Sequence, residues 1–583
     1  MKTGLTSVTF RQKSVDEIIS LAQKAHLDGI EWGGDVHVPA GDTDTAASVR
    51  EKCIAAGLEI LSYGSYYKAL PDQDFAPVLA SARALGAPMI RIWAGNCTPD
   101  SISEDAFRTL AADIRCAAES ASQFGIAVAL EYHRGTMTQT KEGAVRLLQA
   151  VDHPNLYTYW QPNPDVSMEE RLREIQAISP WLRCCHVFAW TAGNERHPLA
   201  EQTGEWSQYL EAVRQSGKKP NLVMEFVCGD SAESFLQDAE ILYKLSPKET
   251  IHRAAFLCNG DRLLRVYDSR TLSELDQMVS LPRIVVTSDT MEEYAPLLKN
   301  AEYLFSTWGM PALTGEQIEK YLPSLKAVFY GAGSVQAFAR PFLEKGIRVF
   351  SAWGANAIPV TEYATAQIIL AGKGFFQCVD HYRHEGRKAA REFTDHQPGN
   401  YNIRIGILGA GMIGRMVLER LMCYDVETLV YDPFVSDAVL ESLHAKRASL
   451  TDIFRECQVI SNHIANLPST VGMLKYEHFS LMKKNATFIN TGRGAQIVEE
   501  DMIRALQEEP ERTAILDVTF PEPPVPESPL NTMRNVILTP HIAGSMNNEV
   551  ARMGKYMLEE ARKLLTGQPC KYEVTEKMLE TMA

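Results

Sequence analysis

Residues 402–414, NIRIGILGAGMIG, constrain the fold of this chain more than any other stretch. Residues 403–408 form a short, mainly apolar run of the kind found in a buried parallel strand. The run stops at Gly409, and apolar side chains then recur at helical spacing over residues 416–421. The stretch therefore predicts a strand, a glycine turn and a helix.

The glycines of this turn follow the pattern G-x-G-x-x-G, which can hold a pyrophosphate. Gly409 permits a tight turn, Gly411 lets the backbone approach the anion, and Gly414 allows the helix to pack closely on the strand. The residues that open the helix, Met412 and Ile413, are expected to offer backbone amides to the same anion. The sequence therefore predicts a dinucleotide-binding domain.

An acidic residue follows the next predicted strand, residues 426–431. From this position the carboxylate of Asp432 can accept hydrogen bonds from the adenosine ribose hydroxyls and repel a 2′-phosphate. NAD is therefore the predicted cofactor, in preference to NADP.

Composition limits the classes of partner. A chain of 583 residues is too long for one core, and its net charge of −15, without a basic run, argues against nucleic acid or an anionic membrane surface. The 11 cysteines show no C-x-x-C spacing, which suits reduced thiols. No signal peptide or membrane span is recognisable. We expect a cytoplasmic protein that acts on small molecules.

Residues 1–246 repeat one pattern eight times, a short apolar run followed by a helical segment. Helices are expected, for example, at residues 15–25, 104–124 and 169–178. The eight runs, which we expect to be strands, are residues 5–10, 29–32, 59–63, 89–93, 126–131, 156–160, 182–186 and 221–226. This number of units in a segment of this length predicts a TIM (β/α)8 barrel.

Polar residues stand at the ends of the last four predicted strands of this barrel, where the strands would meet at one mouth. Two carboxylates, an imidazole and an amide oxygen can bind Mn²⁺ or Mg²⁺ and leave positions open for a substrate's oxygens. The two carboxylates can also move a proton on and off a carbon beside a carbonyl. The alternative is that ordinary polar residues rim the mouth. The four residues are Glu131, Gln161, His186 and Glu225.

At these residues the segment resembles the xylose-isomerase-like sugar isomerase and epimerase family. The resemblance implies that the four residues are metal ligands and that Glu131 and Glu225 act as acid and base. Gln161 stands where the family usually has Asp, which removes one negative charge from the site. Residues 186–198, HVFAWTAGNERHP, resemble the family loop that places an arginine, here Arg196, near the reacting oxygen. Further candidates for substrate binding, after the second strand, are Glu31, Asp35 and His37.

A new α/β series follows SPKET, residues 246–250, which we expect to be a linker. Strands are expected at residues 283–287, 303–306, 327–330 and 348–351. Helices are expected at residues 360–379 and 547–565, the second packing back on residues 255–360. Because the dinucleotide segment lies between these helices, it is predicted to be inserted within another domain.

The segment 255–565 resembles the D-isomer-specific 2-hydroxyacid dehydrogenases. The stretches that carry the resemblance, in the family's order, are YGAGSV, GANAIPVTE, NTGRG, LDVTFPEP and TPHIAG. The resemblance implies a Rossmann NAD-binding domain, residues 361–545, inserted in a flavodoxin-like substrate domain made of residues 251–360 and 546–583.

The chemistry of 2-oxo acid reduction needs a hydride from the nicotinamide and a proton for the developing alkoxide. A histidine near neutral pKa suits the proton transfer, and His541 fits that role. A carboxylate beside it, here Glu522, would stabilise the imidazolium. The guanidinium of Arg493 can bind the substrate carboxylate and carbonyl oxygen in a fork.

The resemblance also implies the lining of the two binding sites. Asp517 is expected to touch the nicotinamide carboxamide, and His463 and Thr491 to line the cofactor site. Ala465 and Leu467 replace a proline and a threonine common in the family, so one side of the cofactor site is expected to differ. The substrate carboxylate is expected on the backbone amides of a loop made of Gly331, Ala332, Gly333 and Ser334.

The sequence thus predicts a bifunctional enzyme, an NAD-dependent 2-hydroxyacid dehydrogenase fused to a metal-dependent sugar isomerase or epimerase. The dehydrogenase family usually pairs through its cofactor domain, which implies a homodimer. Two alternatives stay open: an NAD-sensing regulatory or scaffold protein, and a dehydrogenase with a non-catalytic docking barrel. The sequence names neither substrate.

Overall fold

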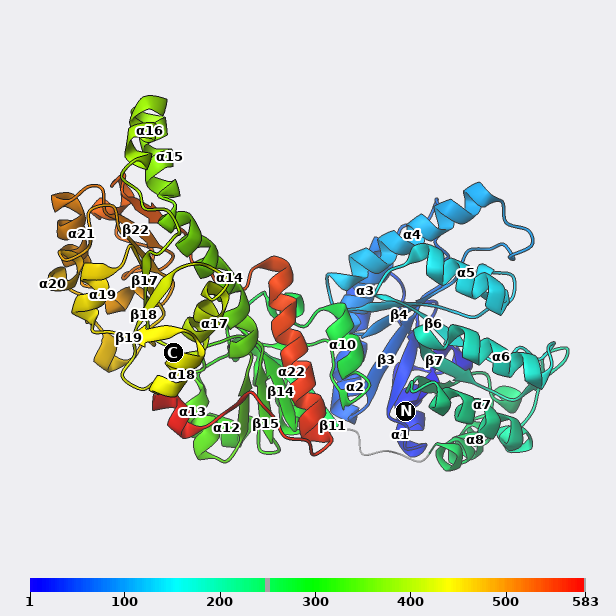
Figure 1. Cartoon of the computed structure of the whole chain (residues 1–583). Coiled ribbons are helices and arrows are strands. Elements are labelled where there is room, and N and C mark those ends of the chain that lie inside the picture. Colours follow the sequence, from blue (N-terminus) through cyan, green and yellow to red (C-terminus); the bar gives the residue numbers. More distant parts are fainter. Residues whose placement is uncertain (247–251, 581–583) are drawn as a thin grey trace. The chain divides into compact units, whose positions relative to one another are not determined.

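The computed structural model describes residues 1–246 and 252–580 (Figure 1). Four of the five residues of the predicted linker SPKET, and residue 251, where the predicted substrate domain begins, lie outside this part. The chain divides into two compact units. The first comprises Met1–Phe329, Lys345–Ile347 and Leu558–Pro569, and the second comprises Tyr330–Glu344, Arg348–Met557 and Cys570–Ala583.

The predicted TIM barrel is confirmed. Eight parallel strands close on themselves in chain order. They are β1 (Thr3–Thr6), β2 (Gly29–Gly33), β3 (Glu59–Gly64), β4 (Met89–Ile92), β5 (Ala127–Leu130), β6 (Leu156–Trp160), β7 (Leu182–Val187) and β10 (Asn221–Met224). The first predicted strand, residues 5–10, was wrong beyond Thr6. The chain turns there into a 3₁₀ helix, and the Ser7 hydroxyl accepts a hydrogen bond from Gly33 N (2.8 Å).

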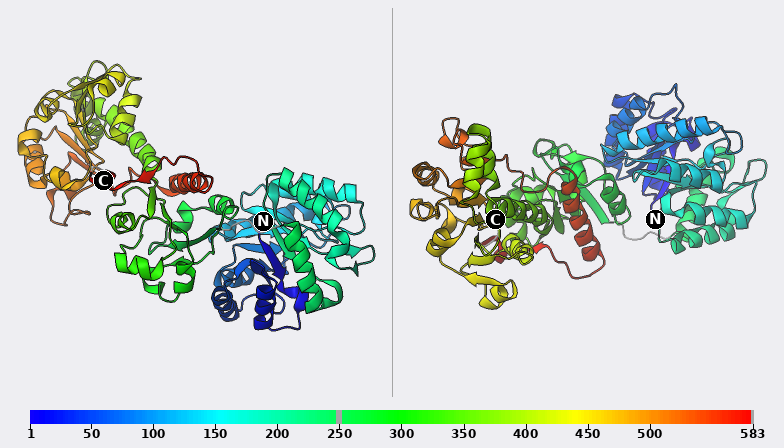
Figure 2. Two further views of the ribbon diagram at one scale, coloured as in Figure 1. Left: turned by 90° about the horizontal axis from the view of Figure 1, so that it is seen from below. Right: turned by 45° about the horizontal axis from the view of Figure 1, so that its top comes forward.

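Helices cover the outside of the barrel (Figure 1, Figure 2). The first shows why they form: Ser14 and Glu17 make a capping box, and the face that includes Ile18 and Leu21 is buried against the strands. The helices are α1 (Val15–Lys24), α2 (Thr43–Ala56), α3 (Ala76–Leu85), α4 (Glu104–Ser122), α5 (Lys141–Val151), α6 (Met168–Ile178), α7 (Thr203–Gln215) and α8 (Ala232–Leu245).

A second sheet follows, in the strand order β12-β11-β14-β15-β16-β24, with β13 beside β11. Its strands are β11 (His252–Leu257), β12 (Val279–Ser280), β13 (Val285–Val286), β14 (Tyr303–Ser306), β15 (Ala327–Tyr330), β16 (Arg348–Ser351) and the antiparallel β24 (Glu573–Val574). Its helices are α9 (Leu263–Val266), α10 (Ser269–Leu275), α11 (Ala295–Lys299), α12 (Gly315–Tyr321) and α13 (Ala339–Glu344). The last long helix, α22 (Val550–Leu565), packs back as predicted, because Arg562 donates to Glu274 (2.8 Å).

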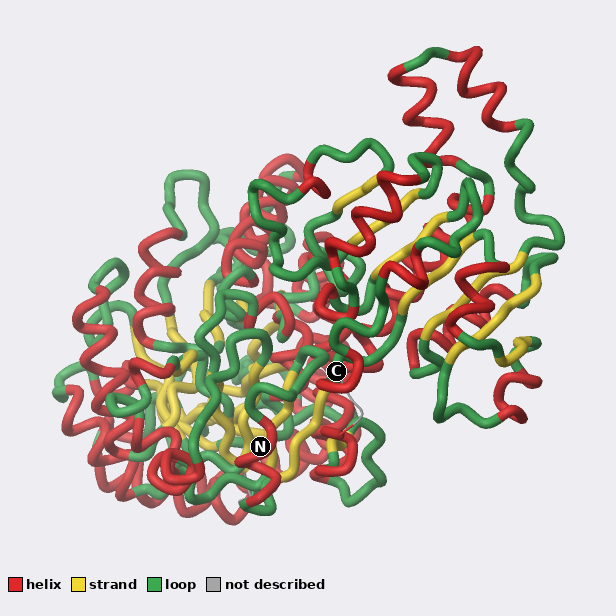
Figure 3. The backbone as a smooth tube through the Cα atoms, turned by 90° about the vertical axis from the view of Figure 1, so that its left-hand side faces the viewer, coloured by secondary structure: helices red, strands yellow, loops and turns green. Residues whose placement is uncertain are grey.

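The predicted helix at residues 360–379 is two helices. One is α14 (Trp353–Gly372) and the next is α15 (Phe375–His384), separated by Gly374 in a left-handed conformation (φ 66°). α15 pairs with α16 (Arg387–Thr394), and the two project from the domain that follows them (Figure 1, Figure 3). The ring centroids of His381 and Phe393 lie 5.0 Å apart at this pairing.

The third sheet is the predicted Rossmann sheet, parallel throughout, with strand order β19-β18-β17-β20-β21-β22-β23. The strands are β17 (Arg404–Leu408), β18 (Glu427–Tyr431), β19 (Ala445–Arg447), β20 (Val459–Asn462), β21 (Thr487–Asn490), β22 (Thr513–Leu516) and β23 (Val536–Leu538). The helices are α17 (Met412–Leu421), α18 (Asp437–Ser442), α19 (Leu450–Glu456), α20 (Tyr476–Phe479) and α21 (Glu499–Glu508). Across the described part of the chain, no helix combines the length and apolarity that crossing a bilayer requires.

Candidate active sites

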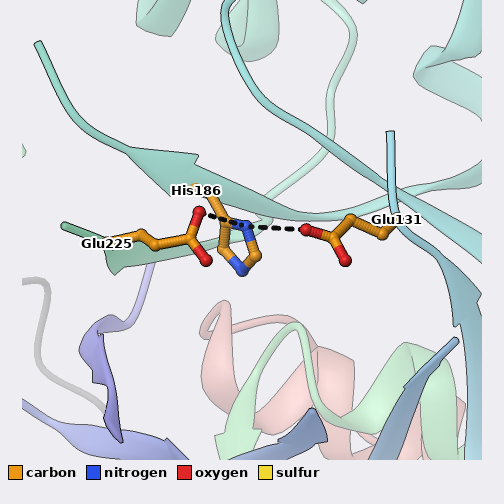
Figure 4. Close-up of side chains that lie close together, drawn as sticks. All are labelled: Glu131, His186 and Glu225. Atoms are coloured by element: carbon orange, nitrogen blue, oxygen red, sulfur yellow. Dashed lines mark ion pairs between the residues drawn. The ribbon is translucent and has the colours of Figure 1, made fainter. Parts of the chain in front are cut away.

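The barrel brings its four predicted ligands to one place. Glu131, Gln161 and Glu225 directly follow β5, β6 and β10, and His186 lies in β7. The Nδ1 atom of His186 lies 3.0 Å from Gln161 Oε1, 3.3 Å from Glu225 Oε2 and 3.9 Å from Glu131 Oε1. Figure 4 shows the imidazole between the two carboxylates. Three of the four side chains are almost completely buried, so their charges depend on one another.

A buried arginine, not anticipated from the sequence, completes this cluster. Arg91 lies in β4, and its guanidinium donates through Nη1 to Glu131 Oε2. Its Nε lies 3.2 Å from Glu31 Oε1. The sequence does carry a signal for this residue, because Arg91 is a charged residue inside the apolar run MIRIW. A charge in such a run is buried only when it is paired.

Electrostatics in the cluster follow from burial and pairing. Burial lowers the pKa of His186, but Glu225 and Glu31 more than reverse this and raise the pKa to about 10. Burial also opposes the charge of Arg91, yet Glu131 and Glu31 hold its pKa well above the ordinary value. For Glu31, Arg91 and His186 outweigh burial, so the pKa of this carboxyl is lowered.

A cavity of about 410 Å³ opens onto Arg91, Glu131, Gln161 and Glu225. Its wall includes several aromatic side chains, and the rings of Trp93 and His133 are stacked with centroids 4.3 Å apart. Flat aromatic faces beside carboxylates suit a small molecule with both apolar and polar faces. The aromatic residues that line it are Tyr66, Trp93, Tyr132, His133, Phe188, Trp190 and Phe226.

The other predicted substrate residues of the barrel have partners of their own. Arg196 pairs with Asp230 (2.5 Å) and lies over the rings of Trp190 and Phe226. Asp35 accepts from Arg11 Nε (2.8 Å), and Arg11 lines the cavity. The ring nitrogens of His37 contact Ser7 Oγ (3.0 Å) and Lys13 O (3.1 Å). Glu31 is buried within the cluster. Their contact with substrate stays a prediction.

The glycine turn has the geometry that its sequence predicts. Gly409 has φ 89°, and a Cβ at Gly414 would lie 2.0 Å from Gly409 O, so only glycine fits there. A Cβ at Gly411 would meet nothing within 4 Å. Gly411, directly before α17, therefore faces open space, and a pyrophosphate on the amides of Met412 and Ile413 stays a prediction.

Asp432 follows β18 and ties it to this turn. Its Oδ2 accepts from Ala410 N (2.7 Å), and its Oδ1 accepts from Phe434 N (2.7 Å) and Val435 N (2.9 Å). The carboxylate is thus held beside the glycine turn, at the position where a Rossmann domain receives the adenosine ribose.

The two residues of the predicted acid–base pair, His541 and Glu522, are in contact. His541 Nδ1 lies 2.7 Å from Glu522 Oε1, and the two side chains are 47% and 42% exposed. Arg493 also interacts with Glu522, while burial lowers the pKa of Arg493. Its Nη1 donates to Gly492 O (2.8 Å). Its contact with the substrate carboxylate stays a prediction.

The predicted cofactor-lining residues make contacts of their own. His463 contacts Ser461 Oγ (2.9 Å) and Thr491 Oγ1 (3.3 Å), and burial lowers its pKa to about 4. Asp517 accepts from Thr539 Oγ1 (2.7 Å) and from Ile542 N and Ala543 N (2.8 and 2.9 Å). Asp517 thereby fixes the loop that carries His541, and its contact with the carboxamide stays a prediction.

The predicted substrate loop, Gly331, Ala332, Gly333 and Ser334, follows β15. The Ser351 hydroxyl donates to Ala332 O (2.9 Å). Asn356, in α14, was not singled out from the sequence. Its amide lies near both Gly333 and Gly544, and its Oδ1 accepts from Ser545 N (3.0 Å). Asn356 therefore links the substrate loop to the segment that carries His541.

Comparison with known protein families identifies one domain in each half of the chain. The family model of the D-isomer-specific 2-hydroxyacid dehydrogenase NAD-binding domain matches residues 366–543, and that of the xylose isomerase-like TIM barrel matches residues 19–226. The chain therefore contains a xylose isomerase-like TIM barrel domain and a D-isomer-specific 2-hydroxyacid dehydrogenase NAD-binding domain at these residues. The xylose isomerase-like domain contains Arg91 and the four predicted ligands, and the NAD-binding domain contains Arg493, Glu522 and His541.

The chain is also similar, over part of its length, to curated proteins and to solved structures. It is similar to D-3-phosphoglycerate dehydrogenase of Methanocaldococcus jannaschii (30% identity, 49% of this chain, 53% of the relative) and of Homo sapiens (31% identity, 36% and 39%). The chain thus spans about half the length of these relatives or less. Among solved structures, D-mandelate dehydrogenase of Rhodotorula graminis matches with 20% identity, 56% and 98% coverage and a TM-score of 0.47.

Proposed function

We propose that the C-terminal half is an NAD-dependent oxidoreductase that interconverts a 2-hydroxy acid and its 2-oxo acid. The observation that carries the proposal is the contact of 2.7 Å between His541 Nδ1 and Glu522 Oε1, in a chain with an NAD-binding domain. A carboxylate on one imidazole nitrogen leaves the other free to exchange a proton with substrate.

Each residue has one role in this proposal. NAD, when bound, supplies or receives the hydride. His541 gives its proton to the developing alkoxide, and Glu522 stabilises the imidazolium that precedes this step. Arg493 and the backbone amides of residues 331–334 hold the substrate carboxylate. Asp432 accepts from the ribose hydroxyls and disfavours NADP.

The test is NADH oxidation by the full chain across a panel of 2-oxo acids, including sugar-derived ones. At least one is expected to be reduced, and His541→Gln is expected to abolish turnover while leaving NADH binding intact. A wild-type chain that binds NADH and reduces no 2-oxo acid would favour the rival, an NAD-sensing regulatory or scaffold protein.

For the barrel we propose a metal-dependent sugar isomerase or epimerase. What supports it is the convergence of Gln161, Glu225 and Glu131 oxygens on His186 Nδ1. A cation that displaced the proton of His186 would leave the charges of Glu31, Glu131, Glu225 and Arg91 summing to −2, which one divalent cation balances, so the residues fit such an ion.

The roles in the barrel follow from this arrangement. Mn²⁺ or Mg²⁺, when bound, would polarise a substrate carbonyl. Glu131, Gln161, His186 and Glu225 would hold it, and Glu131 and Glu225 would take and return a proton at the neighbouring carbon. Metal analysis of the full chain and a ketose–aldose and epimer panel test this. A metal-free chain without activity on the panel would favour a docking barrel.

We further propose that the chain acts on small molecules as a homodimer, without nucleic acid, and that the two substrates belong to sequential reactions on a sugar derivative. The support for the coupling is the covalent fusion itself. It predicts that a product of the barrel, directly or after one further step, is reduced or oxidised by the dehydrogenase.

A further inference from the structure

One carboxylate inside the barrel is tied to five other strands. Glu31, in β2, is fully buried. Its Oε2 accepts from Ser62 Oγ (2.6 Å, β3) and from Tyr159 Oη (2.7 Å, β6), and its Oε1 accepts from Thr6 Oγ1 (3.2 Å, β1). These three hydroxyls fix both oxygens of the carboxylate in one orientation.

The same Oε1 atom of Glu31 faces one nitrogen of Arg91 and one nitrogen of His186. Arg91 Nε lies 3.2 Å away, and His186 Nε2 lies 3.4 Å away. A buried, ionised carboxylate is costly unless every oxygen is paired, so its orientation is strongly determined. Glu31 therefore presents a fixed negative charge to one particular nitrogen of the imidazole.

The two nitrogens of His186 consequently have different surroundings. Nε2 faces Glu31, whereas Nδ1 faces Gln161, Glu225 and Glu131 on the side of the cavity. In metal sites, a carboxylate behind a ligating histidine holds the proton on the far nitrogen and orients the ring.

We propose that Glu31 is a positioning residue of the barrel's cation site. It faces Nε2 of His186 and so fixes the imidazole ring with Nδ1 directed to the side of the cavity, where the cation would lie. Arg91 has a similar role toward Glu131. It donates to Glu131 Oε2 and leaves Glu131 Oε1 directed toward His186 Nδ1. The inference rests on the proposed metal function of the barrel.

The test is direct binding of Mn²⁺ to the full-length chain, followed by electron paramagnetic resonance of the free ion. Glu31→Gln keeps the size of the side chain and removes its charge. We expect this variant to raise the Kd for Mn²⁺ by about 10- to 100-fold. The matched control is Glu174→Gln, because Glu174 is also buried in the barrel and accepts from Trp160 Nε1 (3.2 Å), outside the cluster. The control is expected to bind Mn²⁺ as the wild type does.

The outcomes separate the inference from the function on which it rests. A wild type that binds no Mn²⁺ overturns both. If the wild type binds Mn²⁺, two results overturn the positioning role alone. In one, Glu31→Gln has the wild-type Kd for Mn²⁺; in the other, Glu174→Gln raises this Kd as much as Glu31→Gln does.

A second variant decides the case in which Glu31→Gln does not fold. Tyr159→Phe removes one hydrogen bond to Glu31 and no charge, and far-ultraviolet circular dichroism checks its fold. A Kd for Mn²⁺ raised several-fold supports the positioning role, and an unchanged Kd overturns it.

Discussion

The Arg91 guanidinium donates to the Glu131 carboxylate where neither side chain is more than 4% exposed. The barrel interior therefore holds an ion pair that water does not screen. Removing one member of a buried pair leaves the other charge without compensation, and this loss exceeds the net stability that the pair provides.

Replacing Arg91 with methionine is expected to destabilise the barrel by roughly 3–5 kcal/mol, because Glu131 and Glu31 lose their shared cation. Urea unfolding followed by tryptophan fluorescence measures this, since six of the eight tryptophans lie in residues 1–246. Arg196→Met is the control. Its pair with Asp230 is 32% and 49% exposed, so a change of at most about 1 kcal/mol is expected. Equal effects would contradict a special role for the buried pair.

Glu174 is expected to make barrel stability depend on pH. Burial raises its pKa to about 7, from an ordinary value of 4.5. Because the folded state holds the proton more tightly, this contribution is fully present below pH 4.5 and is lost as the pH rises through 7. The shift corresponds to roughly 3 kcal/mol.

The measurement is the free energy of unfolding from pH 4.5 to 8 for the wild type and Glu174→Gln. The variant should lose less stability across this range, and the difference between the curves isolates Glu174 because all other groups are shared. Parallel curves would mean that the carboxyl titrates normally.

Alanine substitutions at two glycines of the dinucleotide-binding turn should have different effects, one on folding and one on NADH binding. Gly414→Ala puts a methyl group 2.0 Å from Gly409 O and should destabilise the NAD-binding domain. Gly411→Ala meets nothing within 4 Å, so the domain should fold normally but bind NADH at least about tenfold more weakly, because the methyl group occupies the approach of the pyrophosphate. NADH fluorescence titration and thermal unfolding distinguish the two. If Gly411→Ala bound NADH with the affinity of the wild type, the pyrophosphate would not lie against Gly411.

The paired helices α15 and α16 expose large apolar side chains, with Phe375 47% and Tyr382 58% exposed. We expect them to bury this surface in a homodimer. Multi-angle light scattering should give twice the chain mass of 65.0 kDa for the wild type and a monomer for Phe375→Asp/Tyr382→Asp. Tyr243→Asp, at a similarly exposed site on α8, should stay dimeric. A double variant that remains a dimer would rule out this surface.

The sequence predicted those parts of the structure in which a polar residue with recognisable chemistry stands at the end of a periodic apolar segment. The barrel strands and Glu131, Gln161, His186 and Glu225 were predictable because each polar residue follows or ends an apolar run. The contacts of Glu31 were not, because barrel closure brings Thr6, Ser62 and Tyr159 to it from distant segments.

Two local errors have similar physical causes. The helix break at Gly374 was missed because a single glycine is tolerated within a helix, whereas this one has a left-handed backbone (φ 66°) that ends it. The 3₁₀ helix after Thr6 was missed because the run LTSVTF is as apolar as a strand. In both places the local sequence permits more than one conformation, and after Thr6 the contact between Ser7 and Gly33 holds the one observed.

The pairing of β24 with β16 has a consequence for synthesis. Arg348 and Glu573 are joined by two hydrogen bonds across 225 residues, with the whole Rossmann sheet made in between. At about 5–20 residues per second, the ribosome delivers the second partner roughly 10–45 seconds after the first. The barrel is complete before either. During translation, the xylose isomerase-like domain can therefore fold first. The edge of β16 stays unpaired until β24 has been synthesised.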